Sequence, residues 1–219
     1  MFIGHYGPAF GAKAAMRAIP LWVLFIAVQW MDVWWAAFVL TGIEKVRIIP
    51  GFTEGSPLDL YFMPFTHGLL GSLVFSAIFG GIVALFFKQN RRAVFWVTAA
   101  AVFSHWVADF LVHVPDLPLW DDSMKVGLGL WRNIWISMPL ELASITIGAI
   151  FYARYVPARG RVGNVVFWIF VAAMAGLQLY AHTLPPPAGP ADAAQTALIA
   201  YGALAILAGL VDLTRKPNP

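Results

Sequence analysis

Three ionisable residues at four-residue spacing, His105, Asp109 and His113, interrupt an apolar segment of the chain. Residues four apart lie on the same face of an α-helix, about 6 Å apart along its axis. They would therefore form a continuous polar stripe. Two imidazoles and a carboxylate are donors that suit Zn²⁺, and Fe or Mn accept them at higher coordination number. The spacing predicts a metal site.

Other apolar segments carry Asp32, His67 and Glu141 at compatible depth. A charge near the centre of a bilayer costs at least about 2.5–3.5 kcal/mol, so such residues are functional candidates. One helix rarely supplies a complete metal site, and these side chains are the available partners of the stripe. The alternative is that buried His–Asp pairs only hold helices together. The fifth and sixth apolar segments have almost nothing polar near their middles.

Residues of the fourth apolar segment have alternative roles. Glu141 either binds the metal, orients an imidazole ligand or acts as a general base, a role that Asp32 could also fill. Arg132 either extends to the interface with its charge in water or binds a substrate phosphate or carboxylate. We therefore predict Asp32, Glu141 and Arg132 as catalytic residues.

The elements that must position these residues are membrane-spanning helices. Of the 219 residues, 60% are hydrophobic and 11% are charged, whereas about 25% are charged in a soluble domain. Apolar blocks of about 20 residues cross roughly 30 Å of hydrocarbon, where the backbone must be helical. We predict an all-α membrane bundle of about six spans, at 19–41, 62–87, 93–114, 128–153, 162–184 and 193–213.

The connectors between these spans are short, so residues 1–219 are predicted to form a single integral membrane domain. The sequence has no cysteine, so a metal must bind through His, Asp and Glu. It also has no Gly-rich phosphate loop and no nucleic-acid-binding motif. The expected partners are therefore membrane lipid and a lipid-like substrate, and not nucleic acid.

The Lys and Arg residues predict the orientation. Ten of the fourteen lie on one side of the predicted spans: Lys13, Arg17, Lys88, Arg91, Arg92, Arg154, Arg159, Arg161, Arg215 and Lys216. The positive-inside rule then places both termini in the cytoplasm. We expect a multi-pass protein of the inner, cytoplasmic membrane.

The segment before the first span carries His5 in an apolar sequence. In one arrangement, residues 1–18 enter the bilayer as a re-entrant helix with its tip at residues 13–20, and His5 approaches Asp32 and His105. In the other, the segment is an amphipathic helix on the cytoplasmic surface. The physical arguments favour the two arrangements equally.

Several of these motifs together resemble a known family. They are His5-x-Gly7, Asp32 in the first span, Thr66-His67 opening the second, and His105-x-x-x-Asp109 in the third. Over roughly residues 1–120, the chain resembles the LexA-regulated inner-membrane metal-dependent hydrolases. The resemblance implies that the metal-site residues are His5, Asp32, His67, His105 and Asp109. The family typically has Asp-x-Asp where this chain has one Asp, so the site would hold one ion or two.

The sequence leaves three functions open. A bound divalent metal, with Zn favoured over Mn or Fe, would support hydrolysis of a lipid phosphate or lipid ester from the outer half of the bilayer. The alternative is a metal-ion or proton transporter that uses the same cluster. Few polar groups in the inner half of the spans, and no recognisable inverted repeat, favour the hydrolase. The third possible function is that of a structural partner protein whose site is inactive.

Overall fold

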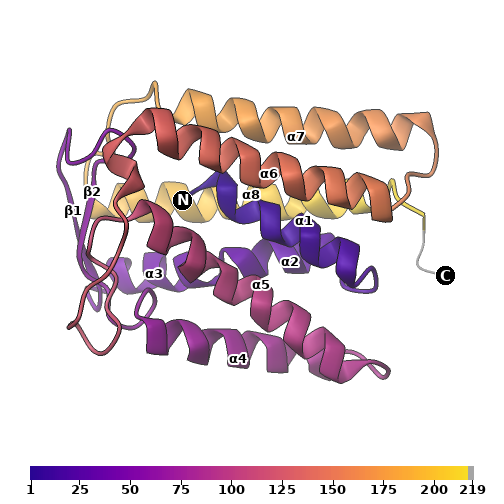
Figure 1. Ribbon diagram of the computed structural model, residues 1–219, viewed down its shortest axis with the longest axis horizontal. Helices are drawn as coiled ribbons and strands as arrows, with labels where there is room; N and C mark the ends of the chain where they lie inside the picture. Colours follow the sequence, from indigo (N-terminus) through magenta and orange to yellow (C-terminus); the bar gives the residue numbers. More distant parts are fainter. Residues whose placement is uncertain (217–219) are drawn as a thin grey trace.

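The computed structural model describes residues 1–216, so the last three residues of the predicted domain lie outside the described residues. Helices make up most of this part of the chain (Figure 1). The α-helices are α1 (Tyr6–Ala15), α2 (Leu21–Val28), α3 (Trp30–Leu40), α4 (Leu69–Leu85), α5 (Arg91–Val112), α6 (Ile134–Tyr155), α7 (Arg161–Ala181) and α8 (Pro190–Asp212). Two short 3-10 helices, η1 (Ile3–His5) and η2 (Leu130–Arg132), and two strands, β1 (Lys45–Ile48) and β2 (Leu58–Phe62), complete the elements.

Four helices within residues 1–216, α5 to α8, are long and apolar enough to cross a membrane. The pair α2 and α3 would make a fifth span, although it is bent by 53°. Helix α4 is apolar but has only 17 residues. The chain is therefore a helical bundle with four to five candidate membrane spans, compared with the six expected.

Two predicted spans begin later than expected. The second was placed from residue 62, but α4 starts at Leu69, because Pro64 cannot continue a helical hydrogen-bond ladder and the preceding residues form β2. The fourth was placed from residue 128, but α6 starts at Ile134 after η2. Both differences leave polar residues in loops at one end of the bundle.

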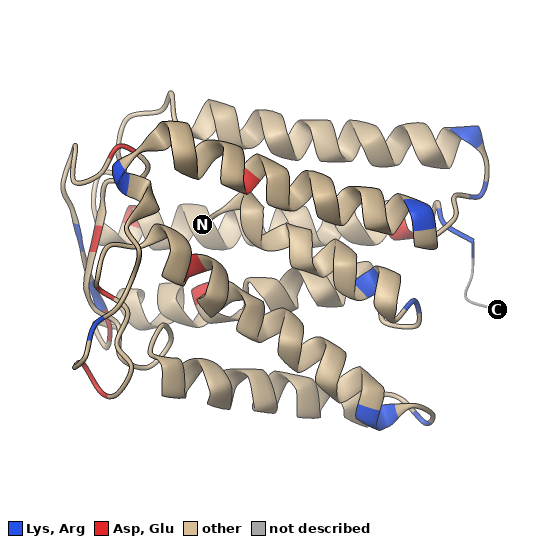
Figure 2. Cartoon of the chain, viewed as in Figure 1, with Lys and Arg blue, Asp and Glu red and all other residues tan. Residues whose placement is uncertain are grey.

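The strands β1 and β2 form an antiparallel pair at that end, with Arg47 opposite Asp59 and Ile48 opposite Leu58. This stretch was expected to be a connector between two spans, so the strand pair is an addition to the predicted all-α fold. Most Lys and Arg residues lie at the opposite end of the bundle (Figure 2). The charge asymmetry read from the sequence is therefore present along the axis of the bundle.

The N-terminal segment lies inside the bundle. Ile3, Tyr6 and Phe10 are completely buried, which excludes an arrangement of this segment on the protein surface. Helix α1 then turns back into α2, and it packs closely on α6, where a side chain at Gly148 would collide with the backbone of Gly7. This close approach places His5 at the middle of the bundle.

Candidate metal centre

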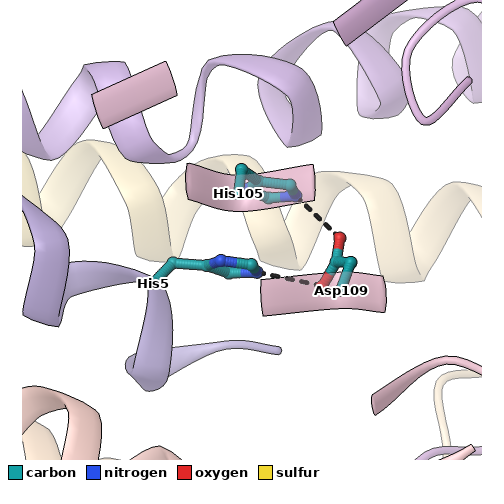
Figure 3. Close-up of side chains that lie close together, drawn as sticks. All are labelled: His5, His105 and Asp109. Atoms are coloured by element: carbon teal, nitrogen blue, oxygen red, sulfur yellow. Dashed lines mark ion pairs between the residues drawn. The ribbon is translucent and has the colours of Figure 1, made fainter. Parts of the chain in front are cut away.

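The carboxylate of Asp109 lies at the centre of a buried cluster of imidazoles. Its Oδ1 is 3.2 Å from Nε2 of His5, which comes from η1 (Figure 3). Its Oδ2 is 3.0 Å from Nε2 of His105, one turn earlier on α5, and 3.5 Å from Nε2 of His67. Nε2 of His113 lies 3.6 Å from Oδ1. Each oxygen of Asp109 therefore faces two imidazoles.

A second carboxylate, from α3, completes the cluster. Oδ1 of Asp32 is 3.2 Å from Nε2 of His67 and 3.4 Å from Nε2 of His105. Two trios have ligand atoms close enough to share an ion: one is His5, His105 and Asp109, and the other is Asp32, His67 and His105. The structure thus brings together all six residues that the sequence predicted as metal ligands.

The imidazoles of His105 and His113 are anchored by their outer nitrogens. Nδ1 of His105 lies 2.7 Å from the carbonyl oxygen of Val28, and Nδ1 of His113 lies 3.0 Å from Oδ1 of Asp116. Because both partners only accept hydrogen bonds, each Nδ1 must carry the proton. In the neutral ring, Nε2 then carries the lone pair and faces the central carboxylates, as in histidines that bind metal ions.

Several ring nitrogens of the cluster are unpaired, although the α-ammonium group of Met1 lies 2.5 Å from Oδ1 of Asp109. Nε2 of His105 and both ring nitrogens of His5 are buried without a hydrogen-bond partner among residues 1–216. Buried polar atoms are almost always paired, so an unpaired set needs an explanation. A divalent ion would satisfy these nitrogens and Asp109 at once, and imidazole with carboxylate is a donor set that binds Zn²⁺. The residues therefore fit a metal.

The imidazole of His67 is anchored through a relay. Oγ1 of Thr66 lies 2.5 Å from Oε2 of Glu44 and 2.8 Å from Nδ1 of His67. The hydroxyl has one proton, which it donates to the carboxylate, so it accepts from Nδ1–H. Oε1 of Glu44 also accepts from the backbone N–H groups of Phe65 and Thr66, both at 2.9 Å. Burial raises the pKa of the Glu44 carboxyl, and His67 and these hydrogen bonds oppose that rise.

Glu141 has a structural role in this arrangement. Its Oε2 accepts from the backbone N–H of Phe2 at 2.9 Å and of Gly4 at 3.2 Å. The hydroxyl of Ser144 on the same helix donates to the carbonyl oxygen of Gly4 at 2.7 Å. Helix α6 therefore holds η1 in place and so positions His5.

Arg132, predicted to bind a substrate anion, is not brought to the cluster. Its side chain is exposed, because η2 ends at this residue before α6 begins. It does not line the cavity beside the cluster, which its neighbour Trp131 does. The structure thus separates Arg132 from the other predicted catalytic residues, Asp32 and Glu141.

Tyr201 and Gln178 are site residues that the sequence analysis missed. The Tyr201 hydroxyl, on α8, donates to Oδ2 of Asp32 at 2.7 Å. Oε1 of Gln178, on α7, lies 3.4 Å from the backbone nitrogen of Ile3. The fifth and sixth spans were expected to have almost nothing polar near their middles, yet each contributes one of these residues to the site. The available signal was the position of both polar side chains well inside an apolar segment.

A cavity of about 420 Å³ opens directly onto the cluster. Its polar floor consists of Asp32, His67, Asp109 and His113. One wall is a single face of α8, which bears Ala193, Thr196, Ala197, Ala200 and Tyr201. Leu177 and Ala181 of α7 also line the cavity. The lining of the cavity is thus polar at the cluster, where a metal could bind, and predominantly apolar elsewhere.

Comparison with known proteins adds no relative. No family model, curated protein or solved structure matches the chain. The geometry of the cluster and its cavity is therefore the basis for a proposal of function.

Proposed function

We propose that the protein is a membrane-embedded, metal-dependent hydrolase that acts on an amphiphilic lipid phosphate or lipid ester. The single observation that carries this proposal is the connection between the His/Asp cluster and the apolar-walled cavity. A site that binds a metal and also accommodates a hydrocarbon chain suits a substrate with a polar head and an apolar tail. The family resemblance over roughly residues 1–120 supports the same class of reaction.

Five of the clustered residues, His5, His67, His105, Asp109 and His113, would hold one divalent ion, and Asp32 would be a further ligand only if a second ion is bound. Zn²⁺ suits these donors best, with Mn and Fe as alternatives. The metal supplies Lewis acidity, which lowers the pKa of a water molecule and polarises a phosphoryl or acyl oxygen. Asp109 and His105 are the ligands on which the site depends most, since each contacts several other members of the cluster.

Asp32 is the proposed general base. Its side chain is 13% exposed, whereas that of Asp109 is 2% exposed. It lines the cavity, so it can accept a proton from a water molecule that enters beside the substrate. The Tyr201 hydroxyl would hold this carboxylate in place. Glu141 is occupied by backbone N–H groups, which makes it the weaker candidate for the base.

The lining of the cavity is consistent with a substrate that enters laterally from the bilayer. The face of α8 that lines the cavity is rich in alanine, so the space beside it is left open. Tyr180, Ala181 and His182 are exposed at its rim, near the end of α7. A hydrocarbon chain lying between α7 and α8 would place its head group over the cluster.

The proposed topology has six spans, with α4 and the bent pair α2–α3 each counted as one. Residues 1–18 would then be a re-entrant hairpin. The end of the bundle that is rich in Lys and Arg would face the cytoplasm, and the cavity would open toward the outer half of the inner membrane. This orientation predicts that the substrate is taken from the outer leaflet.

A metal-ion or proton transporter is the rival function, and the core of the bundle argues against it. Between the cluster and the opposite end lie the fully buried rings of Phe10, Phe25, Tyr152 and Phe167. These rings pack against one another with centroids 4.7–5.5 Å apart. A continuous polar path of the kind that transporters use is not available through such a core.

Two phosphate esters with the same head group, one short-chain and soluble and one long-chain, test this proposal. Purified protein in detergent with added Zn²⁺ should release phosphate, or alcohol from a matched ester pair, faster from the long-chain compound. Asp32→Asn should abolish turnover, whereas Asp121→Asn, an exposed carboxylate, should not. Zn²⁺ or proton flux in liposomes without any hydrolysis would instead establish the transporter.

A further inference from the structure

A second cavity lies at the opposite end of the bundle from the metal cluster. It has a volume of about 240 Å³ and lies between the start of α2, the connection from α6 to α7 and the end of α8. Five of its lining side chains are cationic and one is acidic: Lys13, Arg17, Arg159, Arg215 and Lys216, with Asp212. The lining therefore has a large excess of positive charge.

The single carboxylate in this cavity is already paired with Lys13. Oδ2 of Asp212 accepts from Nζ of Lys13 at 2.9 Å and from the backbone N–H of Leu21 at 3.0 Å. Nζ of Lys13 also donates to the carbonyl oxygens of Arg17 and Ile19, both at 2.9 Å. The ammonium group of Lys13 thus has three partners, whereas Arg17, Arg159 and Arg215 form no direct ion pair with a carboxylate within residues 1–216.

Arg215 is a buried cation with unpaired donors. It is 2% exposed, and its guanidinium lies 4.9 Å from the ring centroid of Tyr152 and 4.5 Å from that of Phe167. Its Nε and Nη2 have no hydrogen-bond partner within residues 1–216, although the side chain lines the cavity. A guanidinium that lies against two aromatic rings and has free donors is suited to bind two oxygens of a phosphate.

The backbone makes this cavity a rigid site. Ala158 and Arg215 form an antiparallel bridge. The backbone N–H of Arg159 donates to the carbonyl oxygen of Thr214 at 2.9 Å, and that of Lys216 donates to Pro157 at 2.9 Å. Nε of Arg159 also donates to the carbonyl oxygen of Arg215 at 2.5 Å. The two segments that carry the cations are therefore fixed to each other.

We propose that this cavity binds the phosphate of an anionic lipid head group. A lipid is favoured over a soluble phosphate because the cavity lies at the ends of apolar helices, at interface depth. The indole of Trp22, which is about half exposed, also lines it, and indoles concentrate at membrane interfaces. Basic pockets between transmembrane helices are known to bind anionic head groups. This site is separate from the metal cluster and would anchor the catalytic bundle in anionic membrane.

Native mass spectrometry of the full chain in detergent tests the proposal. Titration with phosphatidylglycerol should give one tightly bound lipid, and phosphatidylcholine should bind at least about tenfold more weakly, since it carries no net charge. Arg159→Gln with Lys216→Gln should weaken phosphatidylglycerol binding about fivefold for each cation removed. Both side chains are exposed, and the backbone hydrogen bonds that join the two segments remain in this variant, so it should fold. Arg215→Gln should weaken binding further.

The matched control is Arg92→Gln, an exposed cation at the start of α5 outside the cavity. Its binding of phosphatidylglycerol should equal that of the unaltered protein. Equal binding of the two lipids, or an equal loss in Arg92→Gln and the double variant, would overturn the proposal. If inorganic phosphate displaced phosphatidylglycerol at comparable concentration, the ligand would be a soluble phosphate and the lipid assignment would be wrong.

Discussion

The imidazole rings of His5 and His105 stack face to face, with centroids 3.8 Å apart and an interplanar angle of 5°. One ring comes from the N-terminal segment and the other from the middle of α5, so this contact joins parts of the chain that are distant in sequence. Both rings also approach the carboxylate of Asp109. The N-terminal segment is therefore a wall of the candidate site, and the residues that hold it in place should control metal binding.

Glu141→Leu should weaken metal binding without removing a ligand. The substitution deletes the acceptor for the N–H groups of Phe2 and Gly4, so η1 would lose its attachment to α6 and His5 would be displaced. Loss of such a positioning contact typically costs about 10–100-fold in metal affinity. Chelator competition measures the change. Glu141→Gln, which keeps an acceptor oxygen, should stay close to the unaltered protein; equal affinity of both variants would contradict this role.

Gly148→Ala should destabilise the bundle, although alanine normally stabilises helices. The added Cβ would meet the backbone of Gly7, so α1 would be forced away from α6. Overpacking of this kind costs about 1–3 kcal/mol in the free energy of unfolding. The matched control is Gly81→Ala on α4, where nothing lies within 4 Å of the new Cβ. It should be neutral or slightly stabilising. Thermal unfolding in detergent compares the two, and a lower Tm only for Gly148→Ala is expected.

Thr66→Val should impair metal binding through His67. Valine has a similar shape but cannot relay the contact between Glu44 and Nδ1 of His67. The imidazole would lose the hydrogen bond that fixes its proton on Nδ1, and we expect metal affinity to fall by about 10–100-fold. Thr66→Ser keeps the hydroxyl and should restore most of that affinity. An unchanged affinity in Thr66→Val would show that the relay does not orient His67.

Tyr201→Phe should separate catalysis from metal binding. The variant removes only the hydroxyl that donates to Oδ2 of Asp32. If Asp32 is the general base, loss of this hydrogen bond should lower kcat by about tenfold, equivalent to roughly 1.4 kcal/mol. Metal content should not change. Hydrolysis of the long-chain ester, measured with metal analysis of the same sample, provides the comparison; an unchanged kcat would argue against a role for Tyr201.

Spacing and burial were sufficient to predict much of the site. His105 and Asp109 follow from their four-residue separation on one helix, and Asp32 and His67 follow from the cost of placing ionisable groups in apolar segments. The physical arguments left His5 open, and only the resemblance implied it as a site residue, since its position depends on the packing of α1 against α6. The sequence pattern contains no periodic signal for that packing.

Other features depended on loop structure that the sequence pattern did not contain. Glu44 reaches Thr66 because the chain turns into β1 just after α3, and an acidic residue in a connector gives no sign of such a partner. Arg132 was placed in a span because its neighbours are apolar, but α6 begins after it and leaves it exposed. The polar residues Tyr201 and Gln178 could have been recognised from their positions inside apolar segments.

Metal content is the most direct test of the central claim that the His/Asp cluster binds a metal. Full-length protein, purified in detergent, loaded with Zn²⁺ and passed through a desalting column, should retain one or two ions per chain by elemental analysis. His105→Ala and Asp109→Asn should retain almost none while keeping their helical circular dichroism, and Asp121→Asn should match the unaltered protein. The account would be contradicted if the folded, unaltered protein retained no Zn²⁺, Mn²⁺ or Fe²⁺. It would also be contradicted if His105→Ala and Asp109→Asn both retained the metal fully.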